Sequence, residues 1–409
     1  MSQLKTLDHI GEIDGKRVLV RVDINVPIVN GIVSDKTRIE RLELTISELS
    51  SKGAKVILLA HFGRPKGEVV AEISLSRVIP VLCEVFGKTV SFASDCRGEI
   101  AIHAIENMNN GDILLLENTR FHASEEKNCS SFSKELASLG DIFVNDAFSS
   151  AHRAHASTTG IANYLPSYAG RTMQAEIEAL ERGLGRPVHP VIAIIGGTKV
   201  ATKIHMLAHL VSKVDYLVIG GGMANTFLSS IGVGVGTSFC EHHLGDMARS
   251  IMEKARTVGC EIILPTDVVV SDKFSSNSSH EIVVANAVGD KRMILDAGPV
   301  SVEIIANRIA SSNTLIWNGP LGAFELKPFD HATIVTAECA ASATQKGYLV
   351  SVAGGGDTVS ALNHAGVSDR FTYVSTAGGA FLEWIEGKRL PSIALLKKEV
   401  HFHSERPGL

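Results

Sequence analysis

The sequence predicts an α/β protein built from two doubly wound parallel sheets, joined by an interdomain helix and separated by a cleft. Short runs of Val, Ile and Leu alternate with longer helical stretches throughout the 409 residues. Most runs are apolar on both alternating faces, as strands covered by helices on both sides must be. About ten such strands exceed one compact sheet of typical size, so two sheets are expected. The expected strands are 18–22, 56–60, 112–116, 141–144, 191–195, 216–219, 261–264, 314–317, 348–352 and 371–374.

The boundary between the two halves follows from a helical repeat. Met173, Ile177 and Leu180 recur at helical spacing, and a Gly/Pro-rich stop follows them. The tail 401–409 is polar and is expected to fray. The expected parts are an N-terminal domain 1–172, an interdomain helix 173–185, a C-terminal domain 186–380, and a segment 381–409 that packs back toward the N-terminal domain.

Composition excludes several classes of protein. The net charge of −5 disfavours a nucleic-acid-binding domain. Six scattered cysteines contain no CxxC pair, which indicates a reducing compartment rather than a zinc or redox motif. No apolar run approaches ~18 residues, and the N-terminus lacks the apolar core of a signal peptide. We therefore expect a soluble, cytoplasmic protein.

Cations gather after the strands of the first half. Ligands of open α/β sheets bind past the carboxyl ends of the strands. A single Arg is more often a solvated surface residue. Several Arg at one edge of a protein with net charge −5 instead point to a small polyanion, since a guanidinium binds carboxylate or phosphate through two hydrogen bonds. Asp23 and Asn25 would take its hydroxyl groups. The expected cationic and histidine residues are Arg38, Arg64, Arg120, Arg153, His61, His152 and His155.

Glycine-rich turns follow the strands of the second half, at 196–203, 220–225, 318–325, 354–358 and 375–379. One such turn is weak evidence, but four or five at successive strand ends indicate a nucleotide, because glycine lets backbone amides approach a phosphate. Lys199 and Lys203 are four residues apart and are expected on one face of a helix. Asp357 is expected either to bind Mg²⁺ or to cap a helix.

Two common nucleotide motifs are absent. Gly87-Lys88-Thr89 ends like a Walker A loop, but Leu82 stands where that loop needs glycine. Gly232-Val233-Gly234 is followed by Thr237 where a dinucleotide fingerprint needs a third Gly or Ala.

Several segments resemble the phosphoglycerate kinase family, from about Lys16 to Leu396. They are RVDINVP at 21–27, HFGRP at 61–65, LLENTRF at 115–121, WNGP at 317–320 and GGGDT at 354–358. Thr198, Phe62 and Ala377 depart from the family pattern. Ala377 replaces a usual glycine, and alanine would resist a positive φ there.

This resemblance implies two Rossmann-like domains and reversible, Mg²⁺-dependent phosphoryl transfer from 1,3-bisphosphoglycerate to ADP, giving 3-phosphoglycerate and ATP. It also implies a monomer, and the composition already predicts that the protein binds no nucleic acid and no membrane. The implied catalytic residues are Arg38 and Lys203, and the implied metal ligand is Asp357. The implied 3-phosphoglycerate site is Asp23, Asn25, Arg38, His61, Arg64, Arg120 and Arg153. The implied nucleotide site is Gly196, Lys199, Lys203, Gly220, Asn318, Pro320, Glu325, Gly355, Gly356, Asp357 and Thr358.

Two alternatives remain at this point. A dehydrogenase would have the same kind of doubly wound sheet, but the glycine fingerprint of dinucleotide binders is absent from this sequence. A non-catalytic sensor of phosphate ligands would be expected to have lost Lys203, Arg38 or Asp357, and all three are present. Because the two expected sites lie in different domains, transfer requires the domains to close, with hinges expected near Thr172 and at 375–380.

Overall fold

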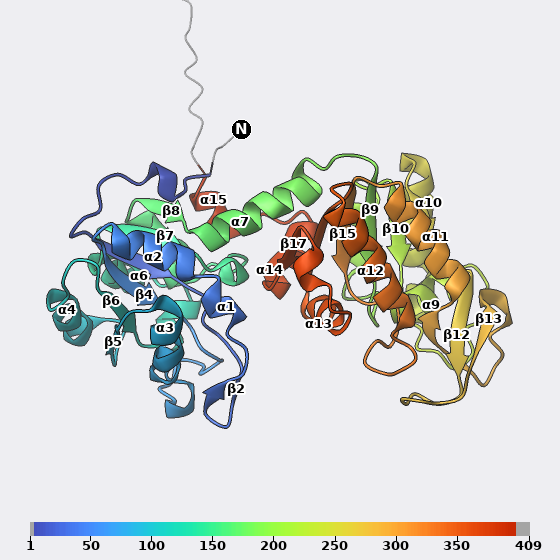
Figure 1. The fold of residues 1–409 in the computed structure, drawn as a ribbon, viewed down its shortest axis with the longest axis horizontal. Helices are drawn as coiled ribbons and strands as arrows, with labels where there is room; N and C mark the ends of the chain where they lie inside the picture. The colour runs from blue at the N-terminus through green and yellow to red at the C-terminus, as the bar shows by residue number, and fades with distance from the viewer. Residues whose placement is uncertain (1–3, 398–409) are drawn as a thin grey trace, which may run out of the picture. The chain divides into compact units, whose positions relative to one another are not determined.

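The computed structural model describes residues 4–397, which divide into two compact units. The first unit is the described part of Met1–Ile177 and Arg389–Leu409, and the second is Glu178–Lys388. Figure 1 labels their elements, and each unit is described here by itself. The helix expected over 173–185 is observed as α7, Arg171–Leu180, followed by a π-helical turn at Glu181–Gly185. The tail 401–409, expected to fray, lies outside the described residues.

The first unit contains a six-stranded parallel sheet with the order β5-β6-β4-β1-β7-β8. On β1, Leu19 packs into a different hydrophobic cluster from its neighbours Val18 and Val20. Both faces of the sheet are therefore buried, as expected for parallel strands with helical crossovers. The strands are β1 (Arg17–Arg21), β4 (Lys55–Leu59), β5 (Val90–Ala93), β6 (Ile113–Leu116), β7 (Ile142–Asn145) and β8 (Ser167–Ala169).

Helices connect these strands, and a small hairpin extends from the unit. The hairpin pairs β2 (Ile28–Val29) with β3 (Ile32–Val33). The two ends of the described range meet, because Leu4 forms an antiparallel bridge with Lys397. The Ser392 amide, in the C-terminal segment, donates to the Ala151 carbonyl (3.3 Å). The helices are α1 (Thr37–Glu40), α2 (Glu43–Ser51), α3 (Ile79–Phe86), α4 (Gly98–Glu106), α5 (Ala123–Glu126), α6 (Ser130–Ser138) and α15 (Pro391–Leu395).

The second unit repeats this architecture with a parallel sheet of order β11-β10-β9-β15-β16-β17. Its central strands are buried throughout: every residue of β9 and β15 is buried. The strands are β9 (Val191–Ile195), β10 (Tyr216–Ile219), β11 (Glu261–Ile263), β15 (Thr314–Asn318), β16 (Val350–Gly354) and β17 (Tyr373–Ser375).

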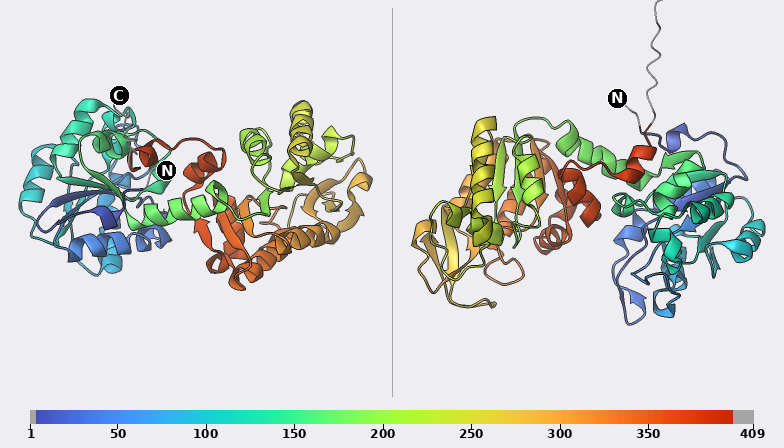
Figure 2. Two further views of the ribbon diagram at one scale, coloured as in Figure 1. Left: turned by 90° about the horizontal axis from the view of Figure 1, so that it is seen from above. Right: turned by 180° about the vertical axis from the view of Figure 1, so that it is seen from behind.

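A second, antiparallel sheet of order β13-β12-β14 belongs to the same unit. Figures 1 and 2 show β12 and β13 at one end of the unit, and β14 contacts α9 and α12. Its strands are β12 (Asp267–Ser271), β13 (His280–Val284) and β14 (Met293–Ala297). The helices of this unit are α8 (Ile204–Leu210), α9 (Gly221–Ser230), α10 (Gly245–Val258), α11 (Pro299–Ala310), α12 (His331–Gln345), α13 (Gly356–His364) and α14 (Gly378–Ile385).

The prediction of parallel sheets is confirmed, and all ten expected strands are present with ends shifted by a few residues. The strands that the sequence did not predict are β5, β8, the hairpin β2–β3 and the antiparallel sheet. β8 has three residues and β2 and β3 have two each, which is too short for a periodic pattern. β13 is largely exposed, so its apolar residues give no burial pattern.

Asp146 holds the start of α7 from the end of β7. Its Oδ1 accepts the Met173 amide (2.9 Å), and it also bonds to Thr45 and Thr172. The side chain is buried, and burial raises the pKa of its carboxyl group despite these hydrogen bonds. Asp146 thus satisfies amides in the first helical turn that have no partner within the helix.

We expect Asp146→Ala to lower the free energy of unfolding by ~1–2 kcal/mol, because the first-turn amides of α7 lose their acceptor. Asp146→Asn keeps an acceptor oxygen and should lose less. Urea unfolding of the full chain, with hydrogen exchange of the Met173 amide, measures both effects. Equal stability and equal exchange in wild type and Asp146→Ala would contradict the assigned role.

Candidate active site

The loop after β1 brings together Asp23, Asn25 and Arg38. The Asn25 amide donates to Asp23 Oδ1 (3.1 Å), which folds the loop back on itself. Arg38, in α1, donates from Nη1 to Asp23 Oδ2 (2.9 Å) and to the Asn25 carbonyl (3.2 Å). Ser149, which follows β7, also donates to Asp23 Oδ2 (2.5 Å). Loops after two different strands therefore meet at Asp23, as the sequence analysis expected of parallel strand ends.

Hydrogen bonds link the loop after β1 to those after β4 and β6. The Gly63 amide donates to Asn25 Oδ1 (3.0 Å), and Arg120 Nη1 donates to the Gly63 carbonyl (3.0 Å). Arg120 is itself fixed because its amide donates to Asn118 Oδ1 (3.1 Å). The residues expected after three separate strands thus share one hydrogen-bonded edge.

Cations at this edge lie close enough to repel one another. Arg120 is buried, and its Nε lies 3.2 Å from Glu126 Oε1. Burial lowers the pKa of Arg120, and Arg153 and Arg64 lower it further by repulsion, although Glu126 opposes them. Arg64 is exposed and Arg153 is half-buried. A bound anion would relieve this repulsion, which is the behaviour expected of an anion site.

The two buried histidines of this edge are neutral at pH 7. The pKa of His61 lies well below its usual value because of burial first, and then because of the charges of Arg21 and Arg120. The same causes lower the pKa of His155 to about 4. Both imidazoles therefore add no charge to the crowded cations, and either could contribute only a hydrogen bond to an anion.

The second unit contains a cavity of about 300 Å³ at the carboxyl ends of its strands. This volume suits part or all of a small-molecule ligand. Glycine turns, apolar side chains and a smaller number of polar side chains line it. The lining residues are Gly197, Thr198, Gly221, Gly222, Ala224, Asn225, Phe239, Pro265, Phe274, Met293, Ile294, Leu295, Asp296, Ala297, Pro320, Leu321, Gly322, Ala323, Phe324, Glu325 and Asp357.

Lys203 is held by main-chain carbonyls beside this cavity. Its Nζ donates to the Gly196 carbonyl (2.6 Å) and, more weakly, to the Asn318 carbonyl (3.4 Å). Burial lowers the pKa of Lys203 to about 8, and Asp357 partly opposes that shift.

The prediction that Lys199 and Lys203 share a helix face is wrong. Lys203 is the N-cap of α8, whereas Lys199 lies in the irregular loop before it.

The ends of β9, β15 and β16 are joined by close backbone contacts. Asn318 Nδ2 donates to the Gly354 carbonyl (2.7 Å), and the Gly319 amide donates to Thr358 Oγ1 (2.7 Å). A Cβ on Gly196 would collide with the Pro320 carbonyl oxygen. Gly196 is therefore required for loop packing, besides any approach of a ligand.

The turns at Gly355 and Ala377 differ in the backbone φ angle that they require. Gly355 has φ +100° and caps α13, so a larger residue would be strained there. Ala377 has φ −96°, which alanine adopts readily. The departure from the usual glycine at Ala377 therefore causes no strain.

Asp357 is an exposed carboxylate in the first turn of α13 that lines the cavity. It lies near enough to Lys203 to raise the pKa of that amine. A carboxylate oxygen open to solvent at a nucleotide-type turn is the donor that Mg²⁺ prefers, and nucleotide-bound Mg²⁺ needs only one or two of them. The residues present thus fit a magnesium ion.

The structure brings most expected nucleotide residues to one edge of the second sheet. Pro320, Glu325 and Asp357 line the cavity itself. Lys199 is exposed and does not line it. The remaining expected residues form the strand-end loops or helix starts around the cavity: Gly196, Lys203, Gly220, Asn318, Gly355, Gly356 and Thr358.

Sequence analysis missed the apolar wall of this cavity. Met293 and Leu295 come from the unpredicted strand β14, and Phe239 and Phe274 come from irregular segments. Pro265 follows an expected strand directly, so the rule that located the other residues could have found it. No pattern in the sequence marks Phe239 or Phe274 as part of a site.

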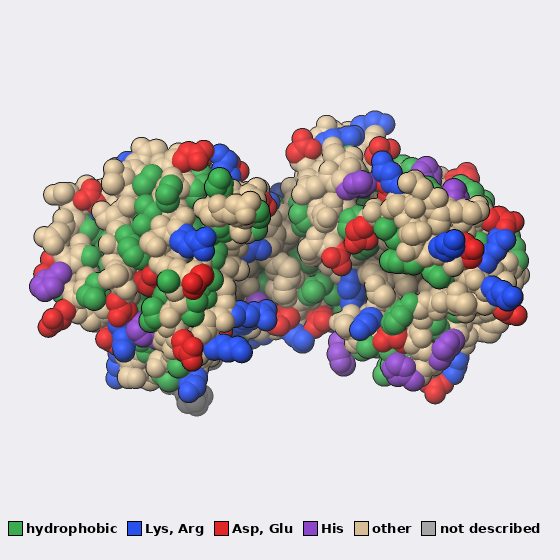
Figure 3. Space-filling model, turned by 90° about the horizontal axis from the view of Figure 1, so that it is seen from below, with side chains coloured by type: hydrophobic (Ala, Val, Ile, Leu, Met, Phe, Trp, Pro, Cys, Tyr) green, Lys and Arg blue, Asp and Glu red, His purple; other side chains and the backbone are tan. Residues whose placement is uncertain are grey.

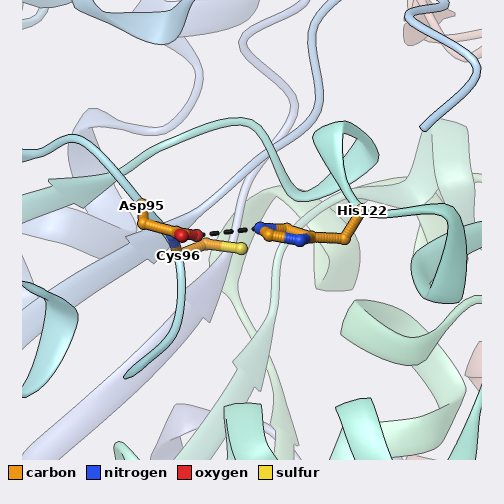
Figure 4. A group of neighbouring side chains, drawn as sticks. All are labelled: Asp95, Cys96 and His122. Atoms are coloured by element: carbon orange, nitrogen blue, oxygen red, sulfur yellow. Dashed lines mark hydrogen bonds and ion pairs between the residues drawn. The ribbon is translucent and has the colours of Figure 1, made fainter. Parts of the chain in front are cut away.

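A cluster of Asp95, Cys96 and His122 lies outside both groups of residues (Figure 4). Their donor atoms lie within 4.8 Å of one another, and His122 Nε2 lies 2.8 Å from Asp95 Oδ1. Burial raises the pKa of the Cys96 thiol well above its usual value, and Cys96 belongs to a hydrophobic cluster under β5 and β6. We interpret the cluster as a hydrogen-bonded Asp95–His122 pair beside a core thiol, because a protonated thiol is a poor metal ligand.

Within residues 4–397, the structure has no helix that is both long and apolar enough to span a membrane. On the face drawn in Figure 3, acidic and basic side chains lie interspersed over both units.

The cationic strand edge and the glycine-lined cavity, each on its own doubly wound unit, define a phosphotransferase that acts on a small anion. The family model described as phosphoglycerate kinase matches residues 7–388. A phosphoglycerate kinase of Agrobacterium fabrum is 63% identical over 396 residues, covering 97% of this chain and 99% of the relative. The chain belongs to the phosphoglycerate kinase family.

Solved structures agree with this assignment. A phosphoglycerate kinase from Coxiella burnetii superposes with a TM-score of 0.90 at 40% identity, over 96% of this chain and 99% of that one. One from Pyrococcus horikoshii gives a TM-score of 0.80 at 27% identity, over 96% and 98%. The expected family and the pair of Rossmann-like parallel sheets are therefore confirmed, and neither the dehydrogenase nor the sensor alternative is supported.

We expect Lys203 to titrate near pH 8 in the unliganded protein, against ~10.4 for an unperturbed lysine. Because the folded-state pKa is the lower one, the unfolded chain binds more protons between these values. The contribution of Lys203 to stability should therefore rise with pH across that window and be smallest below pH 8. NMR of ¹³C-labelled lysine measures the midpoint, with the exposed Lys213 as the control. A midpoint near 10 for Lys203 would contradict the assignment.

Proposed function

We propose that this chain catalyses reversible, Mg²⁺-dependent transfer of a phosphoryl group from 1,3-bisphosphoglycerate to ADP, giving 3-phosphoglycerate and ATP. The observation that carries the proposal is the cluster of mutually repelling cations at the strand edge of the first unit. The glycine-lined cavity of the second unit supplies a separate place for a nucleotide. Family membership supports both assignments.

The acidic substrate is assigned to the first unit. Arg64, Arg120 and Arg153 would neutralise its phosphate and carboxylate, since a guanidinium donates two parallel hydrogen bonds to either group. Neutral His61 would donate one more. Asp23 can only accept hydrogen bonds, so it suits a substrate hydroxyl, and Asn25 can take either role.

The nucleotide is assigned to the second unit. The apolar wall, which includes Phe239, Phe274 and Leu295, suits the flat face of a base. The turns at Gly196 and Gly355 and the start of α13 would face the phosphates, where backbone amides and the positive helix end favour an anion. Lys199 joins this site only if the loop before α8 moves, because it does not line the cavity.

The chemistry requires charge stabilisation rather than proton removal. The acceptor in the ATP-consuming direction is a carboxylate, which is already ionised at pH 7. Arg38 and Lys203 would contact oxygens of the migrating phosphoryl group, because each is a fixed cation beside its own substrate site. Their present partners, the Asp23 carboxylate for Arg38 and main-chain carbonyls for Lys203, hold them in place meanwhile.

Asp357 would hold the magnesium ion together with nucleotide phosphate oxygens. When bound, the ion supplies neutralisation of charge on the phosphates. We further propose that the protein acts as a monomer in the cytoplasm, on nucleotide and phosphoglycerate substrates, and binds no nucleic acid.

Direct transfer also requires motion. Reacting atoms must approach to ~3–3.5 Å. Because the two substrates are assigned to different units, the units must bring them together and exclude water that would hydrolyse the phosphoryl donor. The hinges proposed for this movement remain those near Thr172 and at 375–380.

A coupled assay for ATP formation from 1,3-bisphosphoglycerate and ADP tests the reaction itself. We expect turnover that needs Mg²⁺ and is lost when EDTA is added. Binding of both substrates without any ATP formation would overturn the proposal in favour of a sensor.

We expect Arg38→Ala and Lys203→Ala each to lower kcat by at least ~10²-fold, because each removes a donor to charge that develops in the transition state. Arg120→Ala should chiefly raise the KM for 3-phosphoglycerate. Steady-state kinetics with circular dichroism separates lost activity from lost fold, and the exposed Arg256→Ala is the matched control. Near-normal kcat in Arg38→Ala would refute the role of Arg38.

Small-angle X-ray scattering tests closure. The radius of gyration should fall when 3-phosphoglycerate and a non-hydrolysable ATP analogue with Mg²⁺ are both present, and fall less with either alone. An unchanged radius in the doubly liganded sample would contradict closure.

A further inference from the structure

Arg21 is a fully buried guanidinium at the end of β1, next to the expected anion site but outside the set of residues assigned to it. Its Nη2 lies 2.9 Å from His61 Nδ1, and its Nε donates to Ser157 Oγ (2.9 Å). Its Nη1 donates to the Val22 carbonyl. A buried arginine with this set of partners calls for an explanation, because burying a charge is costly unless it is paired.

The chemistry of the groups fixes the direction of each hydrogen bond. A guanidinium has only donors, so His61 Nδ1 must be the acceptor. A neutral imidazole with an unprotonated Nδ1 carries its proton on Nε2. The contact with Arg21 therefore selects one of the two tautomers of His61.

Arg21 is held in this orientation by a second chain of hydrogen bonds. Ser157 Oγ donates its only proton to Glu125 Oε1 (2.5 Å), so it can only accept from Arg21. The Ser157 amide donates to the other carboxylate oxygen of Glu125 (2.9 Å). Glu125 is fully buried and opposes the effect of burial on the charge of Arg21.

His61 Nε2 makes no hydrogen bond with any residue in the described range 4–397, and the charges facing it are mostly positive. These are Arg21 from β1, Arg120 after β6 and Arg153 after β7, whereas His155 beside them is neutral. In the selected tautomer, Nε2–H offers a donor to an anion. In the other tautomer a lone pair would face the anion and repel it.

We propose that Arg21 is a positioning residue that fixes His61 as the Nε2–H tautomer, so that His61 donates a hydrogen bond to the anionic substrate. Arg21 itself does not touch that substrate. The binding role of His61 rests on the proposed function, but its tautomer does not, since it is set in the unliganded protein.

The direct test is ¹⁵N NMR of the full-length protein labelled at histidine, without ligand. His61 is identified by the signal that disappears in His61→Gln. We expect the Nδ1 shift of an acceptor nitrogen and the Nε2 shift of a protonated one, unchanged from pH 6 to 8. An Nδ1–H tautomer, or a cationic ring at pH 7, would overturn the proposal whether or not the protein proves to be a kinase.

Substitutions test whether Arg21 is what sets the tautomer of His61. Arg21→Met should give a mixture of the two His61 tautomers, because Nδ1 loses the donor that holds it unprotonated, and should weaken binding of 3-phosphoglycerate. Arg17→Met, at the other end of the same strand and ion-paired with Asp141, is the matched control and should leave His61 unchanged. An unchanged tautomer in folded Arg21→Met would refute the role of Arg21.

A second pair of variants keeps the test valid if Arg21→Met fails to fold. His61→Gln can accept from Arg21 and still donate an N–H to the anion, whereas His61→Met can do neither. We expect His61→Met to weaken binding of 3-phosphoglycerate by ~10- to 100-fold, and His61→Gln to recover most of this loss. Calorimetry measures the affinities. Equal losses in both variants would contradict donation from this position.

Discussion

Strands β1, β4, β9 and β15 lie between two hydrophobic layers, and their residues are almost all buried. A polar side chain on either face of such a sheet would lose its hydration without gaining a partner. Chemically active groups therefore lie at the last residues of the strands, such as Arg21 and Asn318, and in the loops that follow them. Because the strands are parallel, loops from successive strands meet at one edge, and this geometry produces each of the two candidate sites.

The positively charged side chains at the strand edges of the two units have different surroundings. In the first unit, Arg120 and Arg153 repel one another, and Glu126 and Glu125 oppose the lowering of the Arg120 pKa. In the second unit, Lys203 has neutral carbonyls as its hydrogen-bond partners, and burial lowers its pKa to about 8. In both units the surroundings disfavour the charged form of a cation. A bound anion would favour that charged form.

Sequence analysis located Asp23, His61, Arg64, Arg120 and Arg153 because each directly follows a strand or its loop, and parallel strands bring those positions together. The prediction for Lys199 was wrong because two residues four apart share a helix face only where both lie in a helix. Here the helix begins after Lys203, so Lys199 lies outside it. The apolar wall of the cavity was missed because Phe239 and Phe274 lie in irregular segments. No periodic sequence pattern predicts the course of such segments.

The amino-acid sequence alone determined the fold class, the order of the strand ends and the chemical character of the groups they carry, since these depend on local periodicity and residue type. Tertiary structure alone decided which groups are buried together. Arg21 is an ordinary strand residue in the sequence, yet it lies fully buried against His61. Burial and orientation decide tautomers and pKa values, and both depend on contacts between residues that are distant along the chain.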